Sequence, residues 1–156
     1  YYPNIYTPAD MIYPLRYLAS TKEFNKLNKI INEKLAVDNF WLSKNSNLQK
    51  AKSLIKIYYN RAMLSNLFFT STKEGWKTDQ GMIYIIFGPP GILHKADNVE
   101  EWIYSNSFSG KKKSFIFKRT VDKNKFENFV LSRNSSYIHD WKKAIEIWNK
   151  GNIYSF

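Results

Sequence analysis

The stretch Gly75-Trp76-Lys77-Thr78-Asp79-Gln80-Gly81 runs directly into an apolar segment, residues 82–87, and then into Gly88-Pro89-Pro90-Gly91. Gly75 and Gly81 give the backbone freedom at either end of the first stretch, and Trp76 supplies a large amphipathic side chain. Thr78 and Asp79 can accept hydrogen bonds from nearby main-chain amides. We therefore predict a rigid, shaped loop that leads into a buried strand over residues 82–87. Such a loop is either a recognition surface or a structural corner.

The two prolines after this segment, Pro89 and Pro90, remove consecutive amide donors from the backbone. A strand that reaches them cannot continue in a sheet, so we interpret Gly88 and the prolines as a strand terminator. Proline-rich turns can also form recognition surfaces, and both prolines are therefore candidate binding residues.

Two helices are predicted before the loop. Apolar residues recur near every 3.6 positions over residues 21–43, and a wider apolar stripe covers residues 48–69. The first stripe consists of Phe24, Leu27, Ile31, Leu35 and Leu42. Residues 1–19 contain prolines and show no period, so we predict an N-terminal arm or linker there and a single domain over residues 20–156.

Downstream of the loop, turn-rich segments separate three further strand candidates, residues 101–105, 114–118 and 126–132. Short strands with short connections imply an antiparallel meander. A final helix is predicted between Ser136, which can cap it, and Gly151, which can end it. The order of elements predicts an α+β fold, a long antiparallel helical hairpin packed on a small antiparallel meander sheet, with a C-terminal helix.

Composition excludes several classes of site. The formal charge is +11, yet Lys far outnumbers Arg and the basic residues are scattered without a nucleic-acid-binding motif, so we do not expect nucleic-acid binding. The absence of cysteine excludes disulfides, thiolate metal sites and thiol nucleophiles. No apolar stretch approaches the roughly 20 residues that span a bilayer. His94 and His139 lack ligand-type neighbours at metal-site spacing, and we predict no metal site and no cofactor.

The loop carries the candidate chemistry. Asp79 could act as a general base, as a cation ligand or as a cap for amides in its own turn, and capping is the commonest role of such side chains. Trp76 could stack on a ligand or seat the loop on the core. Strand alternation places Trp102 and Tyr104 on one face, either as an aromatic layer under the helices or as an aromatic patch beside Trp76.

Several ordered motifs resemble the GWxTD-domain family. They are Phe40-Trp41, Tyr58-Tyr59-Asn60-Arg61, Gly75-Trp76-Lys77-Thr78-Asp79, Tyr84-Ile85-Ile86-Phe87-Gly88-Pro89-Pro90, Glu100-Glu101-Trp102-Ile103-Tyr104 and the tryptophan-rich terminal helix. Where the family often has an acidic residue after the two prolines, this chain has Gly91. The resemblance implies an extracytoplasmic location in a Gram-negative cell envelope, periplasmic or associated with the outer membrane, in a protein exported by a signal or lipoprotein sequence. It implies no particular reaction. Because the chain begins at Tyr1 without methionine, we expect it to be part of a longer protein.

From these features we expect a non-enzymatic, extracytoplasmic protein-binding or assembly module of a bacterial cell-envelope protein. The candidate binding residues are Trp76, Thr78, Asp79, Pro89, Pro90 and Trp102, and the structural glycines are Gly75, Gly81 and Gly88. No residue is assigned a catalytic role. The alternative is a hydrolase or carbohydrate-active domain in which Asp79 and either Glu100 or Glu101 serve as acid and base. The sequence defines neither the partner nor the oligomeric state.

Overall fold

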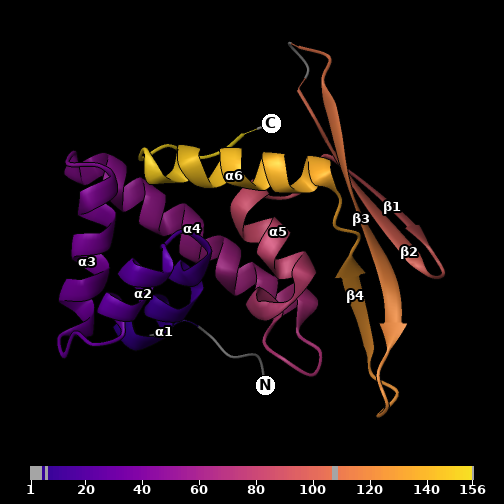
Figure 1. Cartoon of the computed structure of the whole chain (residues 1–156), viewed down its shortest axis with the longest axis horizontal. Coiled ribbons are helices and arrows are strands. Elements are labelled where there is room, and N and C mark those ends of the chain that lie inside the picture. The colour runs from indigo at the N-terminus through magenta and orange to yellow at the C-terminus, as the bar shows by residue number, and fades with distance from the viewer. Residues whose placement is uncertain (1–4, 6, 107–108, 156) are drawn as a thin grey trace.

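The computed structural model describes residues 5, 7–106 and 109–155, and Figure 1 shows a helical part packed against one face of an antiparallel sheet. The helical part contains α1 (Pro8–Ile12), η1 (Tyr13–Tyr17, a 3₁₀ helix), α2 (Thr21–Leu27), α3 (Glu33–Lys44), α4 (Leu48–Phe69), η2 (Gly75–Lys77, also 3₁₀), α5 (Asp79–Phe87) and α6 (Ser135–Asn149). The sheet contains β1 (Ile92–Ala96), β2 (Val99–Ser105), β3 (Lys112–Val121) and β4 (Glu127–Leu131). The predicted α+β class is confirmed.

The sheet is an antiparallel meander, as predicted, with strand order β1-β2-β3-β4. Trp102 and Tyr104 of β2 are buried on the face that also carries Phe115 and Phe117 of β3. The rings of Trp102 and Phe117 lie 4.8 Å apart, and those of Tyr104 and Phe115 lie 5.6 Å apart. These side chains form the aromatic layer under the helices. Sequence reasoning missed β1, whose residues are all exposed and show no alternation of burial.

The helix predicted over residues 48–69 is confirmed at both ends as α4. The single helix predicted over residues 21–43 is wrong, because α2 ends at Leu27 and α3 begins at Glu33. The predicted apolar stripe fails for the same reason: Ile31 lies between the helices and is 100% exposed, and Leu35 is 51% exposed. The buried face of α3 consists instead of Ala36, Val37, Phe40 and Trp41.

Residues 82–87, predicted as a buried strand, belong to helix α5. Every residue from 80 to 87 is buried, so the segment has no polar face that would reveal a helical period. Thr78 begins the helix: its Oγ1 accepts a hydrogen bond from the amide of Gly81 at 3.0 Å. The motif segment therefore leads into a helix, which lies between α4 and the sheet (Figure 1).

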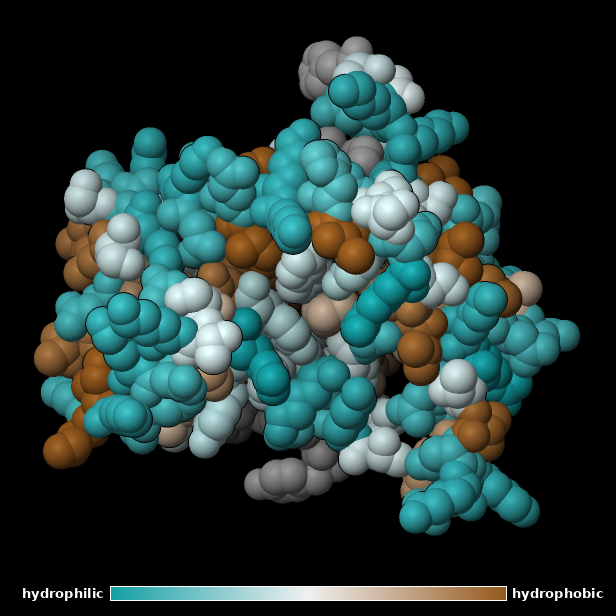
Figure 2. Space-filling model, in the orientation of Figure 1, coloured by the Kyte–Doolittle hydropathy of each residue, from teal (hydrophilic) through white to brown (hydrophobic). Residues whose placement is uncertain are grey.

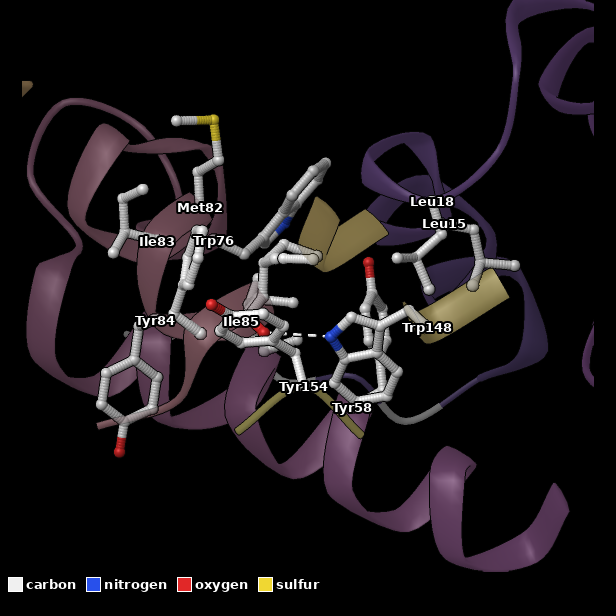
Figure 3. Close-up of a cluster of buried hydrophobic side chains, with 14 of the residues drawn as sticks. Leu15, Leu18, Tyr58, Trp76, Met82, Ile83, Tyr84, Ile85, Trp148 and Tyr154 are labelled. Atoms are coloured by element: carbon white, nitrogen blue, oxygen red, sulfur yellow. Dashed lines mark hydrogen bonds between the residues drawn. The ribbon is translucent and has the colours of Figure 1, made fainter. Parts of the chain in front are cut away.

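Three side chains from distant elements bind the last carbonyl groups of α5, where Gly88 turns the chain with φ 83° toward the two prolines. The contacts are Arg61 Nη1 to Ile85 O at 3.1 Å, Trp148 Nε1 to Ile86 O at 3.0 Å and Tyr104 Oη to Gly88 O at 2.8 Å. Figure 3 shows Trp148 pointing toward α5 beside Tyr58. The Arg61 cation thus lies at the end of α5 where the helix dipole is negative.

The stretch predicted as an N-terminal arm contains α1 and η1, while its residues 1–4 and 6 lie outside the described residues. Leu15 is completely buried, and the hydroxyl of Tyr58 donates a 2.6 Å hydrogen bond to the carbonyl of Pro14. These contacts attach α1 and η1 to the core.

The predicted C-terminal helix is confirmed as α6, but its cap is Asn134 rather than Ser136. Asn134 has extended backbone angles, and its side chain accepts a hydrogen bond from the amide of Tyr137. Gly151 ends the helix as predicted, with φ 73° and its amide bonded to the carbonyl of Trp148. None of the described helices is long and apolar enough to cross a membrane.

Candidate functional site

Gly75 and Gly81 allow two close approaches of backbone at the motif. A Cβ atom on Gly75 would lie 1.8 Å from the carbonyl oxygen of Ser65 in α4, and a Cβ atom on Gly81 would lie 1.9 Å from the carbonyl oxygen of Gly75. No larger residue fits at either position unless the backbone moves. The motif is therefore a tightly packed corner between α4 and α5.

Trp76 is 6% exposed and seats this corner on the helical core. Its amide donates to Oδ1 of Asn66 at 3.0 Å, and its carbonyl accepts a 2.7 Å hydrogen bond from the hydroxyl of Tyr17. The Tyr17 ring meets the indole edge-on, with centroids 6.1 Å apart, and burial raises the pKa of the Tyr17 hydroxyl. These contacts direct Trp76 toward the N-terminal helices.

Asp79 joins the start of α5 to the sheet. Its Oδ2 accepts a 2.8 Å hydrogen bond from the amide of Leu131, and its Oδ1 accepts one of 2.9 Å from the guanidinium of Arg133. The interpretation of Asp79 as a cap for its own turn is wrong, because Thr78 already occupies the capping position. Asp79 is the first helical residue, and its side chain reaches the neighbouring strand β4 instead.

A groove of about 1290 Å³ separates the end of α4 and the start of α5 from the sheet. Figure 2 shows the surface hollowed between the helical part and β4. The structure brings most of the candidate binding residues to this groove, whose lining includes Thr78, Asp79, Pro89, Pro90 and Trp102. Trp76 is the exception, because it faces Tyr17.

Aromatic side chains from four elements line the groove, including Phe129 of β4. Phe69 of α4 packs on Trp102 of β2 with ring centroids 5.4 Å apart, and Tyr84 of α5 lies 5.7 Å from Phe69. Phe68 lies beside them and is 57% exposed. Burial raises the pKa of the Tyr84 hydroxyl. Sequence reasoning missed Phe68, Phe69 and Tyr84, since a helical stripe and an apolar run give no sign of which aromatic residues line a cavity.

Glu100 is a second carboxylate of the groove and is only 6% exposed. Its Oε2 accepts hydrogen bonds from Gln80 at 2.8 Å and from the indole of Trp102 at 3.2 Å. Its Oε1 lies 3.2 Å from the ammonium group of Lys95. Glu100 therefore ties α5 to β2 and fixes the orientation of the Trp102 ring. These three contacts offset the cost of removing the Glu100 carboxylate from water.

Glu101, the other proposed partner of Asp79, is absent from the groove lining, and its Oε2 lies 3.6 Å from Nδ1 of His94 on β1. Among the described residues, no group of three or more histidine, aspartate and glutamate side chains is placed to hold a metal ion.

The sequence was compared with family models, with curated proteins and with solved structures. The model of the GWxTD domain matches residues 1–150 of the 156-residue chain. The curated proteins and the solved structures give no significant match. The matched region includes the whole groove, the corner at Gly75 and the three donors that bind the end of α5. The chain therefore belongs to the GWxTD-domain family.

Proposed function

We propose that this chain is a non-enzymatic protein-binding module whose groove holds a segment of a partner protein. The observation that carries the proposal is the groove itself, which at about 1290 Å³ exceeds the range of roughly 300–1,000 Å³ usual for small-molecule pockets. Its lining combines aromatic rings with Pro89 and Pro90, and such surfaces suit a polypeptide partner.

The contacts of the two groove carboxylates favour binding over hydrolysis. A general acid or base must be able to exchange a proton with the substrate at hydrogen-bonding distance. Both carboxylate oxygens of Asp79 accept hydrogen bonds, from Leu131 and from Arg133, and both oxygens of Glu100 contact neighbouring side chains. Each carboxylate thus acts as a link between structural elements.

The experiment is capture of partners from a membrane and periplasmic extract by crosslinking to the purified chain, followed by mass spectrometry. The groove variant is Phe68→Gln, and the matched control is Leu67→Gln, because Leu67 is 51% exposed on the same helix but is not part of the groove lining. We expect a specific partner that the control retains and the groove variant loses. Equal capture by the two variants would show that the groove is not the binding surface.

We also propose that the module works outside the cytoplasm, in the periplasm or at the outer membrane of a bacterial cell envelope. This proposal rests on the resemblance of the sequence motifs to envelope proteins. Fractionation of cells that express the natural full-length protein tests it, and recovery in the cytoplasmic fraction would refute it.

A further inference from the structure

The outer edge of β4 presents main-chain groups beside the groove. In an antiparallel pair, the residues of a strand alternate between those that bond to the neighbouring strand and those whose amide and carbonyl face away. The amide of Ser132 donates to the carbonyl of Ile116 at 2.8 Å, and the amide of Asp122 donates to the carbonyl of Phe126 at 3.0 Å. These bonds, at either end of the β3–β4 pair, show that even-numbered residues of β4 face β3 and odd-numbered residues face away.

The outward-facing residues of β4 are Glu127, Phe129 and Leu131. The amide of Leu131 binds Asp79, which agrees with this direction. Within the residues that the structure describes, the amide and carbonyl groups of Glu127 and Phe129 have no hydrogen-bond partner. All of β4 lines the groove, so this edge is accessible from it. An unpaired strand edge is a template for a further strand.

The charged residues beside this edge indicate which charge a bound partner strand should carry. Lys73 lines the groove on the side of the α4–η2 segment, and Lys123 and Lys125 lie in the turn before β4. None of these three lysines has an ion-pair partner among the described residues, whereas Asp79 and Glu127 are each already paired with an arginine. Asp122 lies in the same turn, likewise without an ion pair in the described part of the chain, and accepts hydrogen bonds from the amides of Asn124 and Phe126, so it offsets only one of the three lysine charges. The uncompensated charge beside the edge is therefore basic, and it favours an acidic partner.

We propose that an extended acidic segment of a partner protein binds the groove as an added strand on β4, through the amide and carbonyl groups of Glu127 and Phe129. This inference rests on the proposed binding function and specifies its mode. Asp79 sets one limit of the added strand, because it already occupies the amide of Leu131. The exposed hydrogen bond from Ser71 Oγ to Asn128 Oδ1, 2.7 Å long, crosses the groove from the α4–η2 segment and yields to the incoming strand.

The probe is an acetylated, amidated peptide of sequence Glu-Asp-Val-Thr-Phe-Thr-Val, which combines an acidic end with an alternating pattern. Amide hydrogen exchange is followed by NMR on the whole chain, with and without peptide. In the free chain the amides of Glu127 and Phe129 exchange fast, and saturating peptide slows them at least tenfold. The amides of Asn128 and Val130 are slow in both states, because they bond to β3. An unchanged exchange rate at Phe129, or no binding up to about 1 mM peptide, overturns the proposal.

Two N-methylated versions of the peptide test the main-chain bonds without altering the protein. Methylation at one set of alternate nitrogens removes the donors that face β4, whereas methylation at the other set removes donors that face away. One version should lose at least tenfold in affinity and the other should bind like the parent peptide. Equal affinities overturn strand addition.

Variants at Phe129 make the same test from the protein side. Phe129→Pro removes the outward amide and leaves the bonds to β3, whereas Phe129→Ala keeps that amide. We expect the proline variant to bind the peptide at least tenfold more weakly than the alanine variant, and equal binding overturns the strand mode. If partner capture depends on Phe68 but not on the Phe129 amide, the proposed binding function stands and only the addition of a strand to β4 is refuted.

Discussion

The substitution Gly81→Ala gives opposite predictions from local propensity and from packing. Alanine is favoured over glycine inside a helix by about 1 kcal/mol, so propensity alone predicts a more stable protein. The structure predicts the reverse, because the new Cβ would lie 1.9 Å from the carbonyl oxygen of Gly75. An ordinary contact begins near 3.4 Å, so the start of α5 and the η2 turn would have to separate by 1.5 Å, the difference between these two distances.

That displacement also stretches two hydrogen bonds of the corner. Thr78 Oγ1 donates to the carbonyl of Gly75 at 2.7 Å and accepts from the amide of Gly81 at 3.0 Å. Overpacking against backbone costs about 3 kcal/mol, and the two bonds contribute about 1 kcal/mol each. After the propensity gain is subtracted, the net loss is about 4 kcal/mol, a large part of the 5–15 kcal/mol typical of a domain.

Urea and thermal unfolding, followed by circular dichroism, measure this loss, which should lower Tm by about 8–16 °C. The matched control is Gly91→Ala, because the nearest atom to a Cβ on Gly91 is 3.7 Å away and its backbone conformation is accessible to other residues. We expect the control to differ from wild type by less than about 1 kcal/mol. A Gly81→Ala protein at least as stable as wild type would refute the packing of the corner.

Three further predictions concern charged and buried groups. Asp79→Ala should lower the free energy of unfolding in urea by about 1.5–3 kcal/mol, because it leaves the part-buried amide of Leu131 without its charged acceptor. Arg133→Ala should lower it by less than about 1 kcal/mol, since the Arg133 side chain is 55% exposed. Equal losses in the two variants would contradict this ranking. Hydrogen bonds from the backbone and side chain of Ser20 lower the pKa of Glu23, so Glu23 stabilises the fold above its unfolded pKa of about 4.3 and loses this effect as pH falls through the folded pKa. The stability gap between wild type and Glu23→Gln should therefore narrow below about pH 4, and a constant gap would argue against the capping role. Burial raises the pKa of Tyr58, so the free energy of unfolding should fall above about pH 10, and Tyr58 should ionise only as the chain unfolds. Ultraviolet difference spectra of wild type and Tyr58→Phe measure the ionisation of this tyrosine. A Tyr58 signal that titrates before the chain unfolds would contradict the prediction.

Segments with a clear local signal could be predicted from the sequence. The α4 helix carries an apolar stripe and a capping asparagine, and both of its ends were predicted correctly. The meander followed from short alternating segments separated by turns. The α5 helix could not be separated from a strand, because it is buried on all sides and its residues therefore show no polar face.

The site could be predicted only in part, because several of its contacts join residues that are far apart in the sequence. Thr78, Asp79 and the two prolines stand in one unusual segment, and the structure places all of them around the groove. The partners of Asp79, by contrast, lie 52 and 54 positions further along the chain, and no local rule connects them. The orientation of Trp76 away from the groove depends on Tyr17, which is 59 positions earlier.

The way in which the end of α5 is capped has a consequence for folding. Its last carbonyls need Arg61 from α4, Tyr104 from β2 and Trp148 from α6, so α5 cannot be buried without penalty until all three elements have arrived. The most distant of these donors, Trp148, lies 62 residues from its acceptor. The chain must therefore lose much of its conformational entropy before these contacts form, and folding should be cooperative and comparatively slow. During synthesis the emerging chain would therefore keep the end of α5 unprotected until α6, which carries Trp148, has left the ribosome.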